Sequence, residues 1–172
     1  MHFPSRSNQR PTTDFLRETL FNLLGSSADQ FFLDLFAGSG SVGLEAASRQ
    51  AKTVVFVEIS KTLAGVIRDN VSLCGYSERC LIIQADIEWA LSDLYRKECR
   101  CDVIFADPPY NQGFIGETLQ VLKEYPVLQA DGIIVLQHSV REKLPSLPDG
   151  WFLADQRKYG DNLLTFIRMG SA

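Results

Sequence analysis

Short apolar runs alternate with amphipathic stretches along most of this chain. Five runs have the length and near-continuous apolarity of strands that are buried on both faces. They are Phe31–Phe36, Thr53–Glu58, Leu81–Ala85, Asp102–Ala106 and Gly132–Gln137. Between them lie stretches whose apolar residues recur at helical spacing, namely Val42–Arg49, Lys61–Leu73, Ile87–Lys97 and Gly116–Tyr125. The alternation predicts a parallel sheet with helices on both faces.

The N-terminal region departs from this alternation. Residues 1–11 are polar and predict a loose arm. The residues Thr12–Asp14 are three candidate N-caps for a helix that Gly25 would end.

The C-terminal region also changes character. Two strand-like segments, Trp151–Lys158 and Leu163–Arg168, flank the hairpin turn signal Tyr159–Asn162. We therefore expect residues 1–172 to form one α/β domain. Its fold is predicted to be Rossmann-like: a mostly parallel sheet, covered on both faces, with a C-terminal antiparallel hairpin.

The composition is that of a globular protein, with 45% hydrophobic and 22% charged residues. No stretch approaches the ~20 apolar residues of a membrane helix, and the N-terminus lacks the apolar region of a secretory signal. We therefore expect a cytoplasmic protein without membrane contact. The formal net charge of −4 argues against a general polyanion binder.

The cysteines form no recognisable metal-binding pattern. None of them stands in a CxxC pair, and neither histidine of the chain lies near them in sequence. We expect buried thiols and no metal site. The four residues are Cys74, Cys80, Cys99 and Cys101.

A glycine-rich loop, Asp34–Gly43, follows the first expected strand and opens a helix. Its GxGxxG pattern also occurs in dinucleotide sites, where helix N–H groups face a phosphate. Asp34 favours a different ligand, because a pyrophosphate gains nothing from a nearby anion whereas an α-ammonium group does. The methionine part of S-adenosylmethionine would satisfy both halves of such a site. Its other expected contacts are Phe36, Gly38, Ser39 and Gly40.

Acidic residues follow the next two strands. Glu58 ends the second strand, where a carboxylate can accept hydrogen bonds from the ribose hydroxyls of either NAD or S-adenosylmethionine. Asp86 follows the third strand, where it can accept from an adenine amino group, cap the next helix, or do both. We expect Ile59 and Ile87 to pack against the faces of the adenine ring.

The segment Asp107-Pro108-Pro109-Tyr110 ends the fourth strand. Two adjacent prolines fix the backbone and remove two N–H donors. The carboxylate of Asp107 and a bare carbonyl then form an acceptor-only pair that suits an –NH₂ group. Tyr110 adds a flat face on which a flipped-out base can stack.

Together these segments resemble class I methyltransferases that modify amino groups, and more closely the bacterial 16S ribosomal RNA guanine-N2 methyltransferases (RsmD-like). The resemblance runs in order along nearly the whole chain, through Arg10–Asp14, Arg17–Asn22, Asp34–Ala46, Phe105–Tyr110 and Lys158–Asp161. Family members usually carry a basic strand pair ahead of the first segment, where this chain has nine residues. We expect that difference to affect substrate affinity more than chemistry.

The resemblance implies methyl transfer from S-adenosylmethionine to the 2-amino group of a guanine in small-subunit ribosomal RNA, free or in its ribosomal particle. Asp107 and the Pro108 carbonyl would orient the amine and stabilise the charge that develops on it. Tyr110 would stack the base, and Pro109 would keep the loop rigid. A monomer is expected.

Arginines near the N-terminus are candidate RNA contacts. We expect Arg10 and Arg17 to bind phosphates, which carry the sequence-independent part of nucleic-acid affinity.

Other functions remain open at this point. An adenine-N6 methyltransferase acting on RNA or DNA would use the same acceptor pair. A glutamine-amide methyltransferase typically carries NPPY, against which Asp107 argues. An NAD-dependent oxidoreductase could use the GxGxxG loop, although His2 and His138 are poorly placed for hydride transfer. A binding module without catalysis gains no support from such a complete set of site residues.

Overall fold

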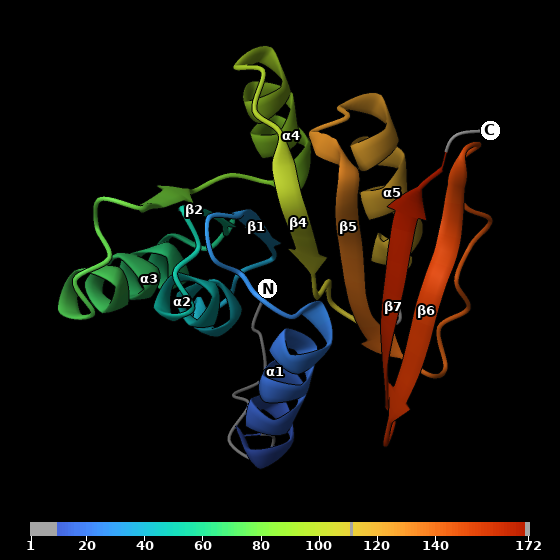
Figure 1. Cartoon of the computed structure of the whole chain (residues 1–172), viewed down its shortest axis with the longest axis horizontal. Helices are drawn as coiled ribbons and strands as arrows, with labels where there is room; N and C mark the ends of the chain where they lie inside the picture. The colour runs from blue at the N-terminus through green and yellow to red at the C-terminus, as the bar shows by residue number, and fades with distance from the viewer. Residues whose placement is uncertain (1–9, 111, 171–172) are drawn as a thin grey trace.

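The computed structural model describes residues 10–110 and 112–170, with side chains from Asp14 onward. Within this part of the chain, seven strands form one sheet in the order β3-β2-β1-β4-β5-β7-β6 (Figure 1). Its strands are β1 (Phe31–Leu35), β2 (Thr53–Val57), β3 (Cys80–Ile83), β4 (Cys101–Ala106), β5 (Leu128–Ser139), β6 (Trp151–Tyr159) and β7 (Asn162–Met169).

The strand directions confirm the predicted architecture. Strands β1 to β5 run parallel to one another, whereas β7 is antiparallel to both β5 and β6. The near-continuous apolarity of β1, β2 and β4 matches their burial on both faces. Strand β5 begins at Leu128 rather than at the expected Gly132, because the exposed polar residues before Gly132 hide the strand pattern.

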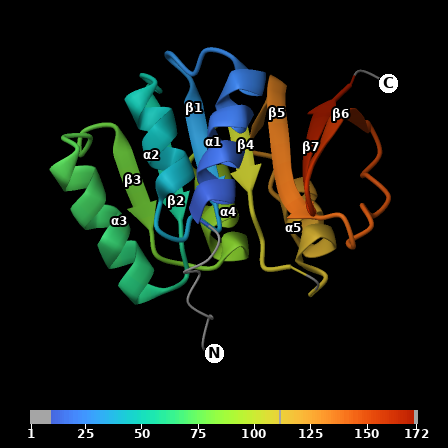
Figure 2. The ribbon, with the colours of Figure 1, turned by 90° about the horizontal axis from the view of Figure 1, so that it is seen from below.

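Helices cover both faces of the sheet (Figure 2). One face carries α1 (Arg10–Leu24), α2 (Ser41–Ser48) and α3 (Lys61–Leu73), and the other carries α4 (Ile87–Arg96) and α5 (Phe114–Glu124). Alternate residues of each strand enter the two cores: on β1, Phe32 packs with the first group of helices and Leu33 with the second. None of the described helices is long and apolar enough to cross a membrane.

The N-terminal helix corrects one expected boundary. Helix α1 begins at Arg10, so the end of the expected arm is helical and the expected caps Thr12–Asp14 lie inside the helix. Pro11 does not break the helix because proline is tolerated in the first turn, where its missing N–H has no helical acceptor. Gly25 ends the helix as expected, with φ 76° and its N–H bonded to the Phe21 carbonyl. Residues 1–9 of the arm lie outside the described residues.

A polar network that is buried at His138 and Thr165 fixes the C-terminal strands. On β5, the His138 ring nitrogen Nε2 lies 2.7 Å from the Thr165 hydroxyl of β7, which also accepts from the Gln156 amide of β6 at 2.8 Å. Burial lowers the pKa of His138, which favours the neutral ring. A shift of one residue would leave these polar groups without partners, so the network selects the observed register of three strands.

The cysteines only partly follow the prediction. Cys101 is buried and Cys80 and Cys99 are half-buried, but Cys74 is exposed at the end of α3, so the expectation of a buried thiol is wrong there. Burial raises the pKa of the Cys80 thiol to about 11, which makes it a poor nucleophile at neutral pH. No cluster of three or more metal-binding side chains occurs in the described part of the chain.

Two glycines allow a direct test of the packing between α2 and β2. A Cβ on Gly43 would overlap the ring of Phe56, whereas a Cβ on Gly65, inside α3, would meet nothing within 4 Å. We expect Gly43→Ala to lower the free energy of unfolding by ~1–3 kcal/mol through overpacking. The control Gly65→Ala should raise it by ~0.5–1 kcal/mol, because alanine loses less backbone entropy in a helix. Urea unfolding measures both, and equal stabilities for the two variants would contradict this packing.

Candidate active site

The candidate site lies where the strand order reverses. Successive strands run from β1 through β2 to β3 in one direction, and from β4 to β5 in the other. The loops after β1 and β4 therefore lead in opposite directions from the carboxyl ends of these strands. In open α/β sheets, the crevice at such a reversal is where ligands bind. The sequence elements predicted to carry the site, the glycine-rich loop and the Asp107–Tyr110 segment, follow these two strands.

The glycine-rich loop needs three residues with positive φ: Phe36 at 60°, Gly38 at 59° and Gly40 at 82°. Phe36 is the notable one, because a bulky residue is uncommon in this conformation and such outliers concentrate at functional sites. A Cβ at Gly38 would meet no atom within 4 Å, which leaves its backbone open to a ligand. Ser39 is exposed beside it. Gly43, in contrast, serves the packing of α2 on β2.

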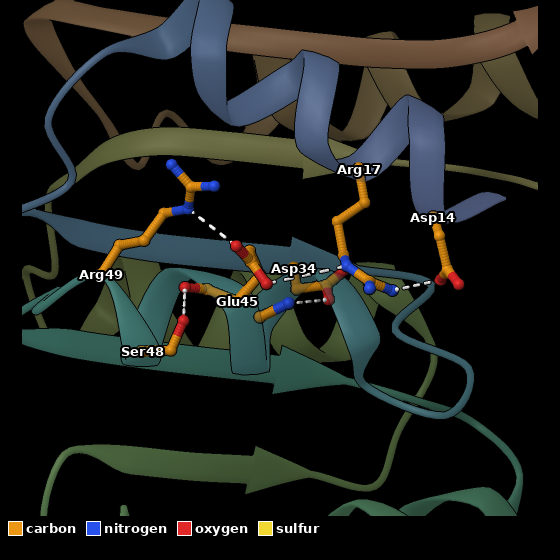
Figure 3. A network of polar contacts seen from close by, with 7 residues as sticks. Asp14, Arg17, Asp34, Glu45, Ser48 and Arg49 are labelled. Carbon is orange, nitrogen blue, oxygen red and sulfur yellow. Dashed lines mark hydrogen bonds and ion pairs between the residues drawn. The ribbon is translucent and has the colours of Figure 1, made fainter.

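Asp34 is buried at the end of β1, with 1% of its surface exposed. Its Oδ2 accepts a hydrogen bond of 3.0 Å from the Gly43 N–H at the start of α2 (Figure 3). Burial raises the pKa of Asp34 to about 8, the Gly43 bond opposes the rise, and the charges of Asp107 and Glu58 add to it. Glu58, directly after β2, and Asp107, directly after β4, thus lie within electrostatic reach of Asp34, and a cation bound beside Asp34 would be strongly favoured.

Glu58 holds the glycine-rich loop against β2. One carboxylate oxygen accepts from the Gly38 N–H at 2.7 Å and the other from the Ser60 N–H at 2.8 Å. The sequence pointed to ribose binding but gave no sign of this structural contact. Carboxylate oxygens can each accept more than one hydrogen bond, so ribose binding by Glu58 stays a prediction.

Asp86 caps α4, as its position after the third strand allowed: Oδ1 accepts from the Trp89 N–H at 2.8 Å. Of the two residues expected to contact adenine, Ile59 is exposed, whereas Ile87 is buried in the core under α4. The exposed ring of Trp89, which the sequence pattern did not single out, lies beside this loop. A pocket of about 330 Å³ is lined by Gln84, Ala85, Asp86 and Trp89.

The residues of the loop after β4 differ in how deeply they are buried. Asp107 and Pro109 are half-buried, Pro108 is buried, and Tyr110 is 37% exposed. Pro108 thus anchors the loop in the protein interior, while part of the Tyr110 side chain is accessible to solvent.

The Tyr110 hydroxyl connects this loop to the C-terminal strands. It donates to Asn162 Oδ1 of β7 at 2.8 Å and accepts from Gln137 Nε2 of β5 at 3.4 Å. Sequence reasoning missed both partners. The only signal was the hairpin turn ending at Asn162, which predicts a turn but not what it contacts.

Arg17 joins two helices. Its guanidinium lies 3.1 Å from the Asp14 carboxylate and 3.8 Å from that of Glu45 on α2, which also binds Arg49 at 2.8 Å (Figure 3). These ion pairs account for Arg17 within the fold, and phosphate binding by this residue stays a prediction. The Arg10 side chain lies outside the described residues.

The strand order, with an antiparallel β7 and the site at the β1–β4 reversal, defines the class: this is the class I methyltransferase fold. The sequence model of the family described as "Conserved hypothetical protein 95" matches residues 1–168. Ribosomal RNA small subunit methyltransferase D of Escherichia coli (strain K12) is 32% identical over 158 residues, which cover 91% of this chain and 78% of that protein. The chain therefore belongs to this family of S-adenosylmethionine-dependent methyltransferases.

Solved structures agree with this assignment. A hypothetical protein of Thermus thermophilus is 30% identical, with coverage of 98% of this chain and 92% of that one and a TM-score of 0.80. The protein SMU.776, solved in complex with S-adenosylhomocysteine, is 16% identical and covers 94% of this chain and 49% of that one. Its TM-score of 0.70 shows the shared fold.

The buried carboxyl group of Asp34 generates a prediction about stability and pH. Its folded pKa of about 8 lies above the ordinary value of 3.8. Below about pH 4 both states hold the proton and the penalty is absent; as the pH rises to about 8, the unfolded chain ionises and the folded chain does not, so stability is lost. Asp34→Asn keeps an acceptor for the Gly43 N–H and cannot ionise.

As the pH rises from about 4 to about 8, the free energy of unfolding of Asp34→Asn should therefore increase relative to that of the wild type. The difference should grow by at most ~1.4 kcal/mol per pH unit. Urea unfolding at several pH values measures the difference. Asp149→Asn removes an exposed loop carboxylate and should follow the wild-type curve. Parallel curves for wild type and Asp34→Asn would show that the Asp34 carboxyl group ionises normally in the fold.

Proposed function

We propose that this protein transfers a methyl group from S-adenosylmethionine to the exocyclic 2-amino group of a guanine in small-subunit ribosomal RNA. The observation that carries the proposal is that Glu58 and Asp107 lie within electrostatic reach of the buried Asp34 at the β1–β4 reversal, with the partly exposed Tyr110 in the same loop as Asp107. The E. coli relative, named as a small-subunit ribosomal RNA methyltransferase, supports this substrate.

The residues at the crevice fit S-adenosylmethionine. Its ammonium and sulfonium groups are both positive, and the charge of a buried Asp34 is disfavoured until a cation lies beside it. We assign the ammonium to Asp34, the ribose hydroxyls to Glu58 and the adenine to the loop of Asp86, next to the exposed Ile59. The open backbone at Gly38 leaves room for the rest of the molecule. When bound, the cofactor supplies a methyl carbon whose bond to sulfur breaks as the amine nitrogen attacks in line.

The chain's own contribution to the reaction is to hold and polarise the amine. Asp107 and the Pro108 carbonyl offer acceptors only, so an –NH₂ group is bound by its two hydrogens with its lone pair directed at the methyl carbon. Positive charge grows on the nitrogen during attack, and the bonds to these acceptors strengthen. The Tyr110 ring holds the plane of the base. The amine proton leaves to Asp107 or to water.

Replacing Asp107 by Asn tests the catalytic assignment. The change keeps the size but removes the negative charge and puts an amide donor within reach of the amine. We expect single-turnover methyl transfer to fall ~100-fold or more, the scale of losing one preorganised electrostatic group. Affinity for S-adenosylmethionine, measured by calorimetry, should change little. Asp149→Asn is the matched control and should retain the wild-type rate. A wild-type rate in Asp107→Asn, or a joint loss of rate and cofactor affinity, would contradict the role of Asp107 in binding the amine.

Mapping of modified nucleotides in ribosomal RNA tests the proposed substrate. RNA from cells lacking the gene should lose an N2-methyl group at a guanine of the small subunit. The wild-type gene should restore it, and the Asp107→Asn gene should not. An unchanged guanine pattern, or the loss of a methyl group from adenine instead, would contradict the proposed specificity.

A further inference from the structure

A series of contacts between side chains and paired residues leads from the loop after β4 to the first turns of α1. The Tyr110 hydroxyl binds Asn162 at the start of β7. Asn162 pairs across the hairpin with Tyr159, the last residue of β6. The ring of Tyr159 meets that of Phe15 edge to face, with centroids 6.0 Å apart and planes at 73°. The hairpin turn and the start of α1 lie at the same edge of the sheet (Figure 1).

Phe15 is not among the buried residues that dock α1 on the sheet. Its side chain is 56% exposed, and α1 is held to the sheet by Leu16, Leu20 and Phe21, which are almost fully buried. Its edge contact with Tyr159 instead places two aromatic rings beside Asn162, the residue that binds the Tyr110 hydroxyl. Grouped exposed apolar side chains of this kind mark surfaces that contact a ligand.

We infer that Phe15 and Tyr159 form a second stacking site, beside Tyr110, for an unpaired RNA nucleotide next to the methylated guanine. This inference rests on the proposed function. Proteins recognise single-stranded RNA by stacking splayed bases on aromatic rings. Phe15 and Tyr159 offer such a surface, and Asn162 connects it to Tyr110.

One cationic side chain on β6 is available to a phosphate. Arg157 lies two residues before Tyr159 and so on the same face of β6. Its side chain is 53% exposed and pairs with Asp155 at 2.8 Å. A surface ion pair of this kind contributes little stability, so a phosphate can compete for the guanidinium.

Stacking can be observed directly with a short single-stranded RNA that carries one guanine and the fluorescent base 2-aminopurine at a neighbouring position. Stacking on an aromatic ring quenches this fluorophore. With the wild-type protein and S-adenosylhomocysteine, we expect quenching when the fluorophore is on one side of the guanine. Phe15→Leu and Tyr159→Leu should abolish it and weaken RNA affinity ~5-fold to ~100-fold, the range for one stacked base.

The control is Phe152→Leu, the same change at a 46% exposed position near the other end of β6. It should leave quenching and RNA affinity at wild-type values. Phe15→Leu alters an exposed side chain and so tests the site even if Tyr159→Leu proves unstable in thermal unfolding.

The outcomes separate this inference from the proposed function. Absence of quenching by the wild type, or equal quenching by Phe15→Leu and Phe152→Leu, overturns the second stacking site. Transfer of methyl to adenine rather than guanine in the same RNA contradicts the proposed specificity. The comparison of Phe15→Leu with Phe152→Leu would still support the stacking site in that case, since stacking does not depend on which neighbouring base is methylated.

Discussion

Two carboxylate-to-backbone hydrogen bonds hold the loop on which the site depends. Asp34, at the end of β1, binds the Gly43 N–H at the start of α2, and Glu58, after β2, binds the Gly38 N–H in the loop between them. The loop has left-handed residues at Phe36, Gly38 and Gly40 that carry conformational strain or entropy cost. The hydrogen bonds to Asp34 and Glu58 hold the loop in this conformation and offset that cost.

The same arrangement creates a tension between stability and function. Burying Asp34 beside two other acidic residues raises its pKa to about 8, so the folded chain is less stable near neutral pH than an uncharged residue would make it. A cationic ligand reverses this balance, because it favours the ionised carboxylate. A site that is unfavourable without a nearby positive charge is one that selects a ligand carrying cationic groups.

The antiparallel end of the sheet contributes to the site as well as to the fold. The network of His138, Thr165 and Gln156 sets the register of β5, β6 and β7. That register brings Asn162 and Gln137 to the Tyr110 hydroxyl and Tyr159 to Phe15. A shift of one residue along β7 would turn Asn162 to the other face of the sheet and release the Tyr110 ring.

The sequence by itself determined the layers of the fold and predicted candidate site residues at the ends of three strands. Buried parallel strands have to be apolar along their length, and a ligand loop needs its glycines in fixed places, so both leave local patterns. Asp34, Glu58 and Asp107 were predicted as site residues because each directly follows or ends a recognisable strand, and the structure brings these three together.

Only the tertiary structure decided which segments that are distant in sequence contact one another. Nothing local to Asn162 indicates Tyr110, 52 residues away, and nothing near Phe15 indicates Tyr159. Ile87 was expected to pack against adenine, which stays a prediction; only the structure shows that Ile87 is buried while Trp89 two residues later is exposed. Periodicity shows that a helix has an apolar face, but which of its residues meet the sheet depends on how the helix docks, and docking is set by the packing of the whole core.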